Sequence, residues 1–106
     1  MTHVTTHILD ASTGTPASGV EVSLRDAAGI ALAMGRTDAD GRLALGPDVL
    51  EPGEYALVFA TGAHFAAQGT AAFHPSVTVA FTVADRPHYH VPLLLSPFAY
   101  TTYRGS

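Results

Sequence analysis

Two histidines are the side chains of this sequence best suited to acid–base chemistry. His7 and His90 each lie on a stretch where apolar and polar residues alternate, and each occupies the polar position. Because successive side chains of a strand point to opposite faces, both imidazoles are expected to point away from the core. An imidazole titrates near neutral pH, so either ring could act as a general base. If the strands share a sheet, the two rings lie on one face; two ordinary surface histidines are the alternative.

Arg42 is the third residue that could take part in a reaction, and it follows the turn residues 37–41, TDADG. A fixed guanidinium can hold a planar anion or an amide oxygen through two hydrogen bonds. An arginine that merely flanks a hairpin turn is the alternative. Asp38 and Asp40 suit turn formation better than catalysis, and Gly41 supplies a residue that tolerates positive φ.

A metal site is a further alternative, because His88 and His90 form an H-x-H pair on one strand face. A third ligand would have to be His7 or His74, and no carboxylate is placed nearby. The pattern is therefore expected to hold no metal. Three histidines, at positions 3, 64 and 74, have no partner that the sequence identifies.

The last four residues, Tyr103 to Ser106, read YRGS. A frayed end or a vector-derived tail is one interpretation. Against it, the alternation of the preceding strand continues without a break into Tyr103. A tail attached to a buried strand would bring Arg104, the Ser106 hydroxyl and the terminal carboxylate to the same face as the histidines.

The elements that must position these residues are short strands. Hydrophobic side chains recur with a period of two, and Gly-, Asp- and Pro-containing turns separate the runs. The predicted strands are 3–9, 20–26, 30–36, 41–45, 54–60, 76–83, 87–95 and 98–104. One Ala-rich segment, 62–69, lies between two glycines and predicts about two turns of helix. The pattern indicates an all-β sandwich.

Composition narrows the class of protein further. The chain has 106 residues, no Cys, no Lys and five Arg, and only 13% of its residues are charged. This excludes disulfides, thiolate chemistry and a basic surface for nucleic acid. No leader or membrane-spanning run is visible, so we expect a cytoplasmic protein without a membrane partner. Both faces of segment 87–103 look apolar, which predicts an oligomer packed through this sheet.

Four motifs together give the chain a resemblance to a known family. They are THILD at residues 6–10, TDADGR at 37–42, HYHVPLLLSP at 88–97 and the terminal YRGS. The sequence resembles the 5-hydroxyisourate hydrolases, the transthyretin-like enzymes of urate degradation, over nearly its whole length. YRGS at the end is the motif that separates these hydrolases from the hormone carrier transthyretin.

The resemblance implies a transthyretin-like (prealbumin-like) sandwich of two four-stranded sheets with one short helix, forming one domain over residues 1–106. It implies a homotetramer with active sites at the dimer–dimer interface, and a hydrolase that needs no cofactor. The catalytic residues that it implies are His7, Arg42, His90 and Ser106. The substrate-binding residues that it implies are His7, Arg42, Tyr103, Arg104, Gly105 and Ser106. The reaction is the hydrolytic opening of the lactam ring of 5-hydroxyisourate.

Three other functions stay open at this point. The stretch 16–59 also resembles non-catalytic transthyretin-like adhesion and regulatory modules, which need neither HYHVPLLLSP nor YRGS. A small-molecule carrier could use the same channel between subunits. A metal-dependent enzyme could use His88 and His90.

Overall fold

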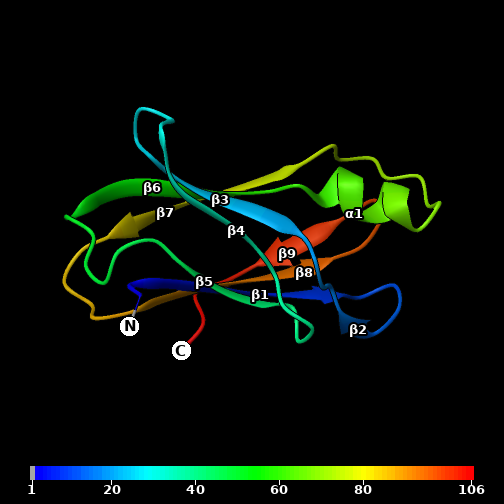
Figure 1. Cartoon of the computed structure of the whole chain (residues 1–106), viewed down its shortest axis with the longest axis horizontal. Helices are drawn as coiled ribbons and strands as arrows, with labels where there is room; N and C mark the ends of the chain where they lie inside the picture. Colours follow the sequence, from blue (N-terminus) through cyan, green and yellow to red (C-terminus); the bar gives the residue numbers. More distant parts are fainter. Residues whose placement is uncertain (1) are drawn as a thin grey trace.

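The structure, a computed structural model, describes residues 2–106 as two β-sheets and one short helix (Figure 1). In chain order the elements are β1 (Val4–Asp10), β2 (Thr15–Pro16), β3 (Glu21–Asp26), β4 (Ala31–Arg36), β5 (Arg42–Leu45), β6 (Gly53–Phe59), α1 (Thr61–Ala67), β7 (Val77–Val83), β8 (Tyr89–Leu95) and β9 (Tyr100–Thr102). Each of the predicted strands is present, with its ends within two residues of the prediction. The all-β sandwich is therefore confirmed.

One sheet has the order β2-β1-β8-β9, with β5 also paired to β1, and the other has the order β4-β3-β6-β7. The first sheet thus has five strands rather than the expected four. The extra strand, β2, is only two residues long and pairs with the end of β1, whereas β5 pairs with its beginning. Pro16 has no N–H for the ladder, which keeps β2 short and hid it from the alternation pattern.

Strand β9 is shorter than predicted because a turn precedes it. The Ser96 N–H and hydroxyl both donate to the Ala99 carbonyl, at 2.9 and 3.0 Å. Phe98 therefore lies in a hairpin turn and is exposed rather than being part of a strand.

The core lies between the sheets and takes alternate residues from both. In β1 the buried side chains are those of Val4, Thr6, Ile8 and Asp10, and the residues between them are only half-buried. In β8 the inward set is Tyr89, Val91, Leu93 and Leu95. Leu24, Leu57, Phe59 and Val83 close the core from the second sheet. Burial of these apolar surfaces is the main stabilising contribution to such a fold.

Helix α1 crosses one end of the sandwich, next to the loop that leads to β7 (Figure 1). It covers Thr61–Ala67, close to the predicted 62–69, and Phe65 anchors it in the core. Gly69 follows the helix at φ 68°, the left-handed conformation that ends many helices. Within residues 2–106 no helix is long and apolar enough to cross a membrane.

Strands β1 and β8 run side by side and parallel, which brings together residues more than eighty positions apart. Thr5 lies opposite His90 in this register, and His7 lies opposite Pro92. On the other side of β1, Arg42 of β5 lies opposite His7. This three-strand arrangement positions the residues selected from the sequence.

Candidate active site

His7 and His90 both point away from the core, on the outer face of the first sheet. Each is half-buried and alternates with fully buried neighbours on β1 and β8. The shared sheet and the shared outward direction are as the alternation predicted. The two histidines are not directly opposite each other, because His90 faces Thr5 and His7 faces Pro92 across the strand pair.

A hydrogen-bonded turn carries Arg42 to this face. The Asp38 carboxylate accepts hydrogen bonds from the N–H groups of Asp40 and Arg42, at 2.8 and 3.0 Å. Gly41 has φ 74°, and a Cβ there would stand 2.5 Å from the Ile8 carbonyl oxygen, so only glycine fits. That close approach pins the turn against β1, since the Ile8 N–H donates to the Gly41 carbonyl at 2.8 Å.

The Thr5 hydroxyl connects two imidazoles at the start of β8. Its Oγ1 lies 2.8 Å from Nε2 of His88 and 2.8 Å from Nδ1 of His90. The two rings stand nearly parallel, with centroids 6.4 Å apart and planes 22° apart. His88 is therefore held through Thr5 as part of the same cluster as His90.

The C-terminal tail folds back over His90. The Gly105 N–H donates to the His90 carbonyl at 2.9 Å. A Cβ on Gly105 would come within 2.4 Å of Cδ2 of the His90 ring, so the tail approaches the imidazole as closely as glycine allows. This contact brings Ser106 beside the histidine cluster.

These residues surround a pocket of about 510 Å³ on the outer face of the first sheet, which we call the outer-face pocket. Its lining residues are Thr5, Thr6, Arg36, Asp38, Arg42, Leu43, Ala44, His88, His90 and Ser106. Three of the four expected catalytic residues are among them. His7 is not among the described lining residues and lies next to the pocket, opposite Arg42.

Tyr103 and Arg104, expected to bind substrate, lie elsewhere in this structure. They line a separate cleft of about 470 Å³ at the side of the sandwich where β7 and β9 have free edges. His90 lines this cleft as well, together with Phe81 and Tyr89. The tail therefore passes from the cleft to the outer-face pocket, and only its end reaches the pocket.

The surroundings of His90 favour its neutral form. Partial burial lowers the pKa of His90, and electrostatic repulsion from Arg42, His88 and His7 lowers it further, while a hydrogen bond to the Thr5 backbone opposes the shift. A lowered pKa leaves the imidazole unprotonated at neutral pH, and an unprotonated imidazole can accept a proton. His90 thus has the protonation state required of a general base.

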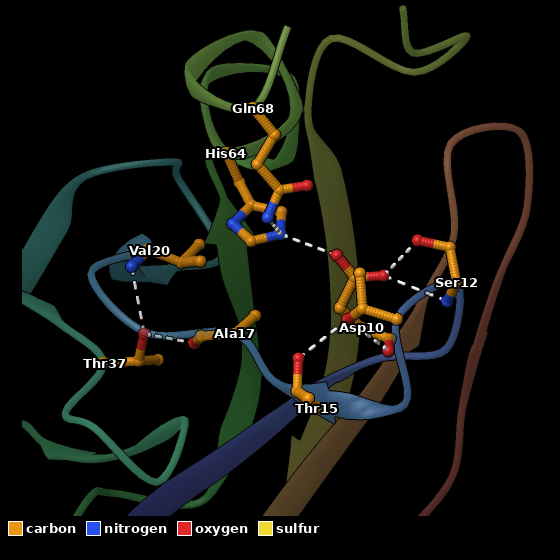
Figure 2. Close-up of polar contacts among 9 residues, drawn as sticks. Asp10, Ser12, Thr15, Ala17, Val20, Thr37, His64 and Gln68 are labelled. Carbon is orange, nitrogen blue, oxygen red and sulfur yellow. Dashed lines mark hydrogen bonds and ion pairs between the residues drawn. The ribbon is translucent and has the colours of Figure 1, made fainter. Parts of the chain in front are cut away.

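The histidines without a sequence-based partner turn out to have partners. The His64 ring lies 3.0 Å from the Asp10 carboxylate, which also accepts hydrogen bonds from the Ser12 N–H and hydroxyl (Figure 2). Burial raises the pKa of Asp10, but the bonds from Ser12 and His64 outweigh it, and the net pKa is lowered. This pair joins α1 to the end of β1.

His3 and His74 are held in other ways. His3 is buried, with Nδ1 accepting from the Leu50 N–H at 2.8 Å and Nε2 lying 2.7 Å from the Arg86 carbonyl. His74 packs edge-on against Phe73 and Tyr100. Both arrangements are those of structural side chains.

The potential metal ligands do not form a metal site in the part of the chain that the structure describes. Across residues 2–106 no three His, Cys, Asp or Glu side chains lie together in a way that could hold an ion. The H-x-H pair instead faces the Thr5 hydroxyl.

Sequence reasoning missed Thr5. Alternation places Thr5 on the same outward face as His7, so that much of the signal was present. Its two imidazole partners became evident only with the register of β1 against β8, because they lie 83 and 85 residues away.

Comparisons with known proteins identify the family of this chain. A family model described as the HIUase/Transthyretin family matches residues 4–105. The 5-hydroxyisourate hydrolase of Caulobacter vibrioides is 49% identical over 116 residues, covering 100% of both chains. That of Mesorhizobium japonicum is 46% identical over 114 residues, covering 97% of this chain and 91% of the relative.

Solved structures give the same result. The 5-hydroxyisourate hydrolase of Klebsiella pneumoniae superimposes with a TM-score of 0.90 at 44% identity, covering 97% of this chain and 98% of that one. Sea bream transthyretin in complex with thyroxine superimposes with a TM-score of 0.89 at 35% identity, covering 97% and 94%. The fold is thus that of a transthyretin-like β-sandwich. The chain belongs to the HIUase/Transthyretin family.

Proposed function

We propose that this protein hydrolyses 5-hydroxyisourate, opening its six-membered lactam ring to give 2-oxo-4-hydroxy-4-carboxy-5-ureidoimidazoline. The observation that carries the assignment of the site is the convergence of His90, Arg42 and Ser106 on the outer-face pocket. The assignment of the substrate rests on the hydrolase relatives, which match this chain over nearly their whole length.

His90 is the general base of the proposed mechanism. Its lowered pKa leaves it neutral, and it lines the pocket, whereas His7 stands beside it. A water molecule gives a proton to His90 as its oxygen attacks the lactam carbonyl carbon. The carbon–nitrogen bond then breaks, and the leaving nitrogen takes back the proton that the imidazole holds.

Arg42 holds the substrate and stabilises the negative charge that develops on the carbonyl oxygen. The turn fixes the Arg42 backbone beside the pocket, and a guanidinium there can donate two hydrogen bonds to the oxygen on which the charge develops. His7, opposite Arg42, orients the substrate or its hydroxyl group. Ser106 fixes the attacking water. Gly105, bound to the His90 backbone, and the preceding Tyr103 and Arg104 hold the tail in place.

The assembly that we propose is a homotetramer in the cytoplasm with the active sites at the interface between dimers. Support comes from apolar side chains on the outer face of the first sheet, where half-buried Leu9 lies opposite half-buried Leu94. Exposed Tyr100 and Tyr103 lie on or next to the free edge of β9. Sedimentation should give four times the 11.0 kDa mass of one chain. A monomer in dilute solution would contradict this assembly.

The test of the activity uses freshly made 5-hydroxyisourate, generated from urate with urate oxidase. The ultraviolet absorbance of the intermediate should decay faster with the protein than in buffer alone. Chelator should leave the rate unchanged, because the proposed mechanism uses no metal. A folded protein that does not accelerate the decay would contradict the proposal.

A small-molecule carrier is the second candidate, since one close structural neighbour was solved in complex with thyroxine. The same assay separates the two functions. Binding of a ligand without turnover would favour the carrier.

A further inference from the structure

The Thr5 hydroxyl has only one hydrogen but contacts two ring nitrogens, at 2.8 Å each. It can therefore donate to one imidazole, and the other ring must donate to it with an N–H. With both rings neutral, two arrangements exist, and they differ in which nitrogen of His90 carries the hydrogen.

In the first arrangement Nδ1–H of His90 donates to Thr5, and Thr5 donates to Nε2 of His88. His90 then presents a free lone pair on Nε2, as a general base must. In the second arrangement His88 donates to Thr5, and Thr5 donates to Nδ1 of His90. Nε2 of His90 then carries the hydrogen and cannot accept another.

We propose that Thr5 is a positioning residue that keeps His90 in the first arrangement, and that Thr5 and His88 form a proton relay behind it. When Nε2 of His90 takes a proton from water, its Nδ1 proton passes to Thr5 Oγ1. The Thr5 hydrogen passes at the same time to Nε2 of His88. His90 is then neutral, His88 holds the positive charge, and the reverse transfer returns the proton.

The surrounding structure holds this relay in a single geometry. Thr5 is paired to His90 through the β1–β8 register, so the hydroxyl lies directly beside the ring. Gly105 of the tail restricts the ring at another atom, because a Cβ on Gly105 would stand 2.4 Å from Cδ2 of His90. With the ring contacted at Nδ1 and restricted at Cδ2, the tautomer is the variable that remains, and the Thr5 hydroxyl sets it.

The test uses Thr5→Val, which keeps the shape and removes the hydroxyl, and Thr5→Ser, which keeps the hydroxyl. The inference rests on the proposed function for its kinetic part. We expect Thr5→Val to lower kcat about ten- to hundredfold with a smaller change in KM, as for loss of a hydrogen bond to a group that becomes charged. Thr5→Ser should recover most of the rate. Thr78→Val, an exposed threonine on β7 of the other sheet, is the matched control and should behave as wild type.

A second readout does not depend on turnover. Long-range ¹⁵N–¹H correlation spectra distinguish the two neutral tautomers of a histidine. We expect the Nδ1–H tautomer for His90 in the wild type and in Thr5→Ser, and a shift toward Nε2–H in Thr5→Val. The variant His88→Phe, which removes the final acceptor, should shift the tautomer in the same direction without altering Thr5.

The outcomes separate the two proposals. A wild-type His90 that is mainly Nε2–H, or a tautomer that does not respond to Thr5→Val, would overturn the relay. Unchanged kcat in a folded Thr5→Val protein would overturn it as well. A Thr5-dependent tautomer in a protein that does not hydrolyse 5-hydroxyisourate would leave the hydrogen-bond coupling standing and contradict the proposed function alone.

Discussion

Two histidine sites lie at different places on the first sheet and differ in the partner that each imidazole has. At the end of β1, His64 lies 3.0 Å from the Asp10 carboxylate, with side chains only 9% and 1% exposed. At the beginning of β1, the Thr5 hydroxyl lies between His88 and His90, with Arg42 nearby in the outer-face pocket. One ring therefore has an anionic partner, and the other has a neutral partner and a cation.

The difference shows how the surroundings of a histidine can suit it to a structural role or to a catalytic role. A buried carboxylate in hydrogen-bond contact with the imidazole holds the ring in place, which suits a link between α1 and β1 (Figure 2). Partial burial and a neighbouring guanidinium lower the pKa of His90 and favour a neutral imidazole with a free lone pair. The environment of a histidine thus predicts its role better than its exposure does, and four substitutions or conditions test this contrast.

The largest expected effect is on turnover at the outer-face pocket. His90→Asn should lower kcat/KM by about a hundredfold to ten-thousandfold, the range for loss of an acid–base group. Its melting temperature should change little, because His90 is only half-buried. His74→Asn is the control, since His74 lies against Phe73 and Tyr100. Equal rates for His90→Asn and wild type in the absorbance assay would contradict the catalytic role of His90, and with it the difference between the two histidine sites.

The next effect is on stability at the other site. His64→Ala removes a hydrogen-bond partner of the buried Asp10 carboxylate, and should lower the free energy of unfolding by about 1–3 kcal/mol. Turnover per folded molecule should stay near that of wild type. Gln68→Ala removes the exposed side chain that lies 3.4 Å from the His64 ring but leaves the His64–Asp10 contact, and should cause a clearly smaller loss in urea unfolding. A folded His64→Ala protein with strongly reduced turnover would contradict a purely structural role.

A smaller effect is expected from the tail. Gly105→Ala places a methyl group where the His90 ring lies, so the tail or the ring must move. A displacement of this size should reduce kcat/KM about ten- to hundredfold, because reacting groups lose their alignment. The melting temperature should remain close to that of wild type, since Gly105 packs on the surface of the sheet. An unaffected rate would show that the tail does not position His90.

The smallest expected effect is on the stability of the fold at low pH. The pKa of Asp10 is lower in the folded protein than its ordinary value, so the ionised carboxylate stabilises the fold. This stabilisation is fully present above the unfolded pKa of about 3.9 and is lost as the pH falls through the folded value. Urea unfolding between pH 6 and pH 3 should therefore show a steeper loss for wild type than for Asp10→Asn. Glu54→Gln, an exposed carboxylate on β6, should leave the wild-type slope unchanged.

The strands and the outward direction of the histidines could be predicted from the sequence, because alternation with period two is a local signal. The pairing of His7 with Arg42 is not a local signal, because the two residues are 35 positions apart and meet only when β5 pairs with β1. The helix followed from an Ala-rich run between two glycines.

The two hydrogen-bonded histidine sites could not be predicted in the same way. His64 and Asp10 are 54 residues apart, and Thr5 is more than eighty residues from both of its imidazole partners. Such contacts depend on which strands are neighbours and on their register, and no short-range pattern encodes either. The two-residue strand β2 was missed for a simpler reason, since it is too short for any alternation.

The parallel pairing of β1 with β8 also has a consequence for synthesis of the protein. Thr5 leaves the ribosome more than eighty residues ahead of His88 and His90, and strands β2 to β7 are made in between. Until then β1 can pair with β2 and β5, but the edge that will receive β8 is open. Parallel pairing between distant segments is slow, and unpaired strand edges promote aggregation. The growing chain is therefore most exposed to misassembly just before its histidine cluster can form, and shielding of that edge by a chaperone would raise the yield of folded protein.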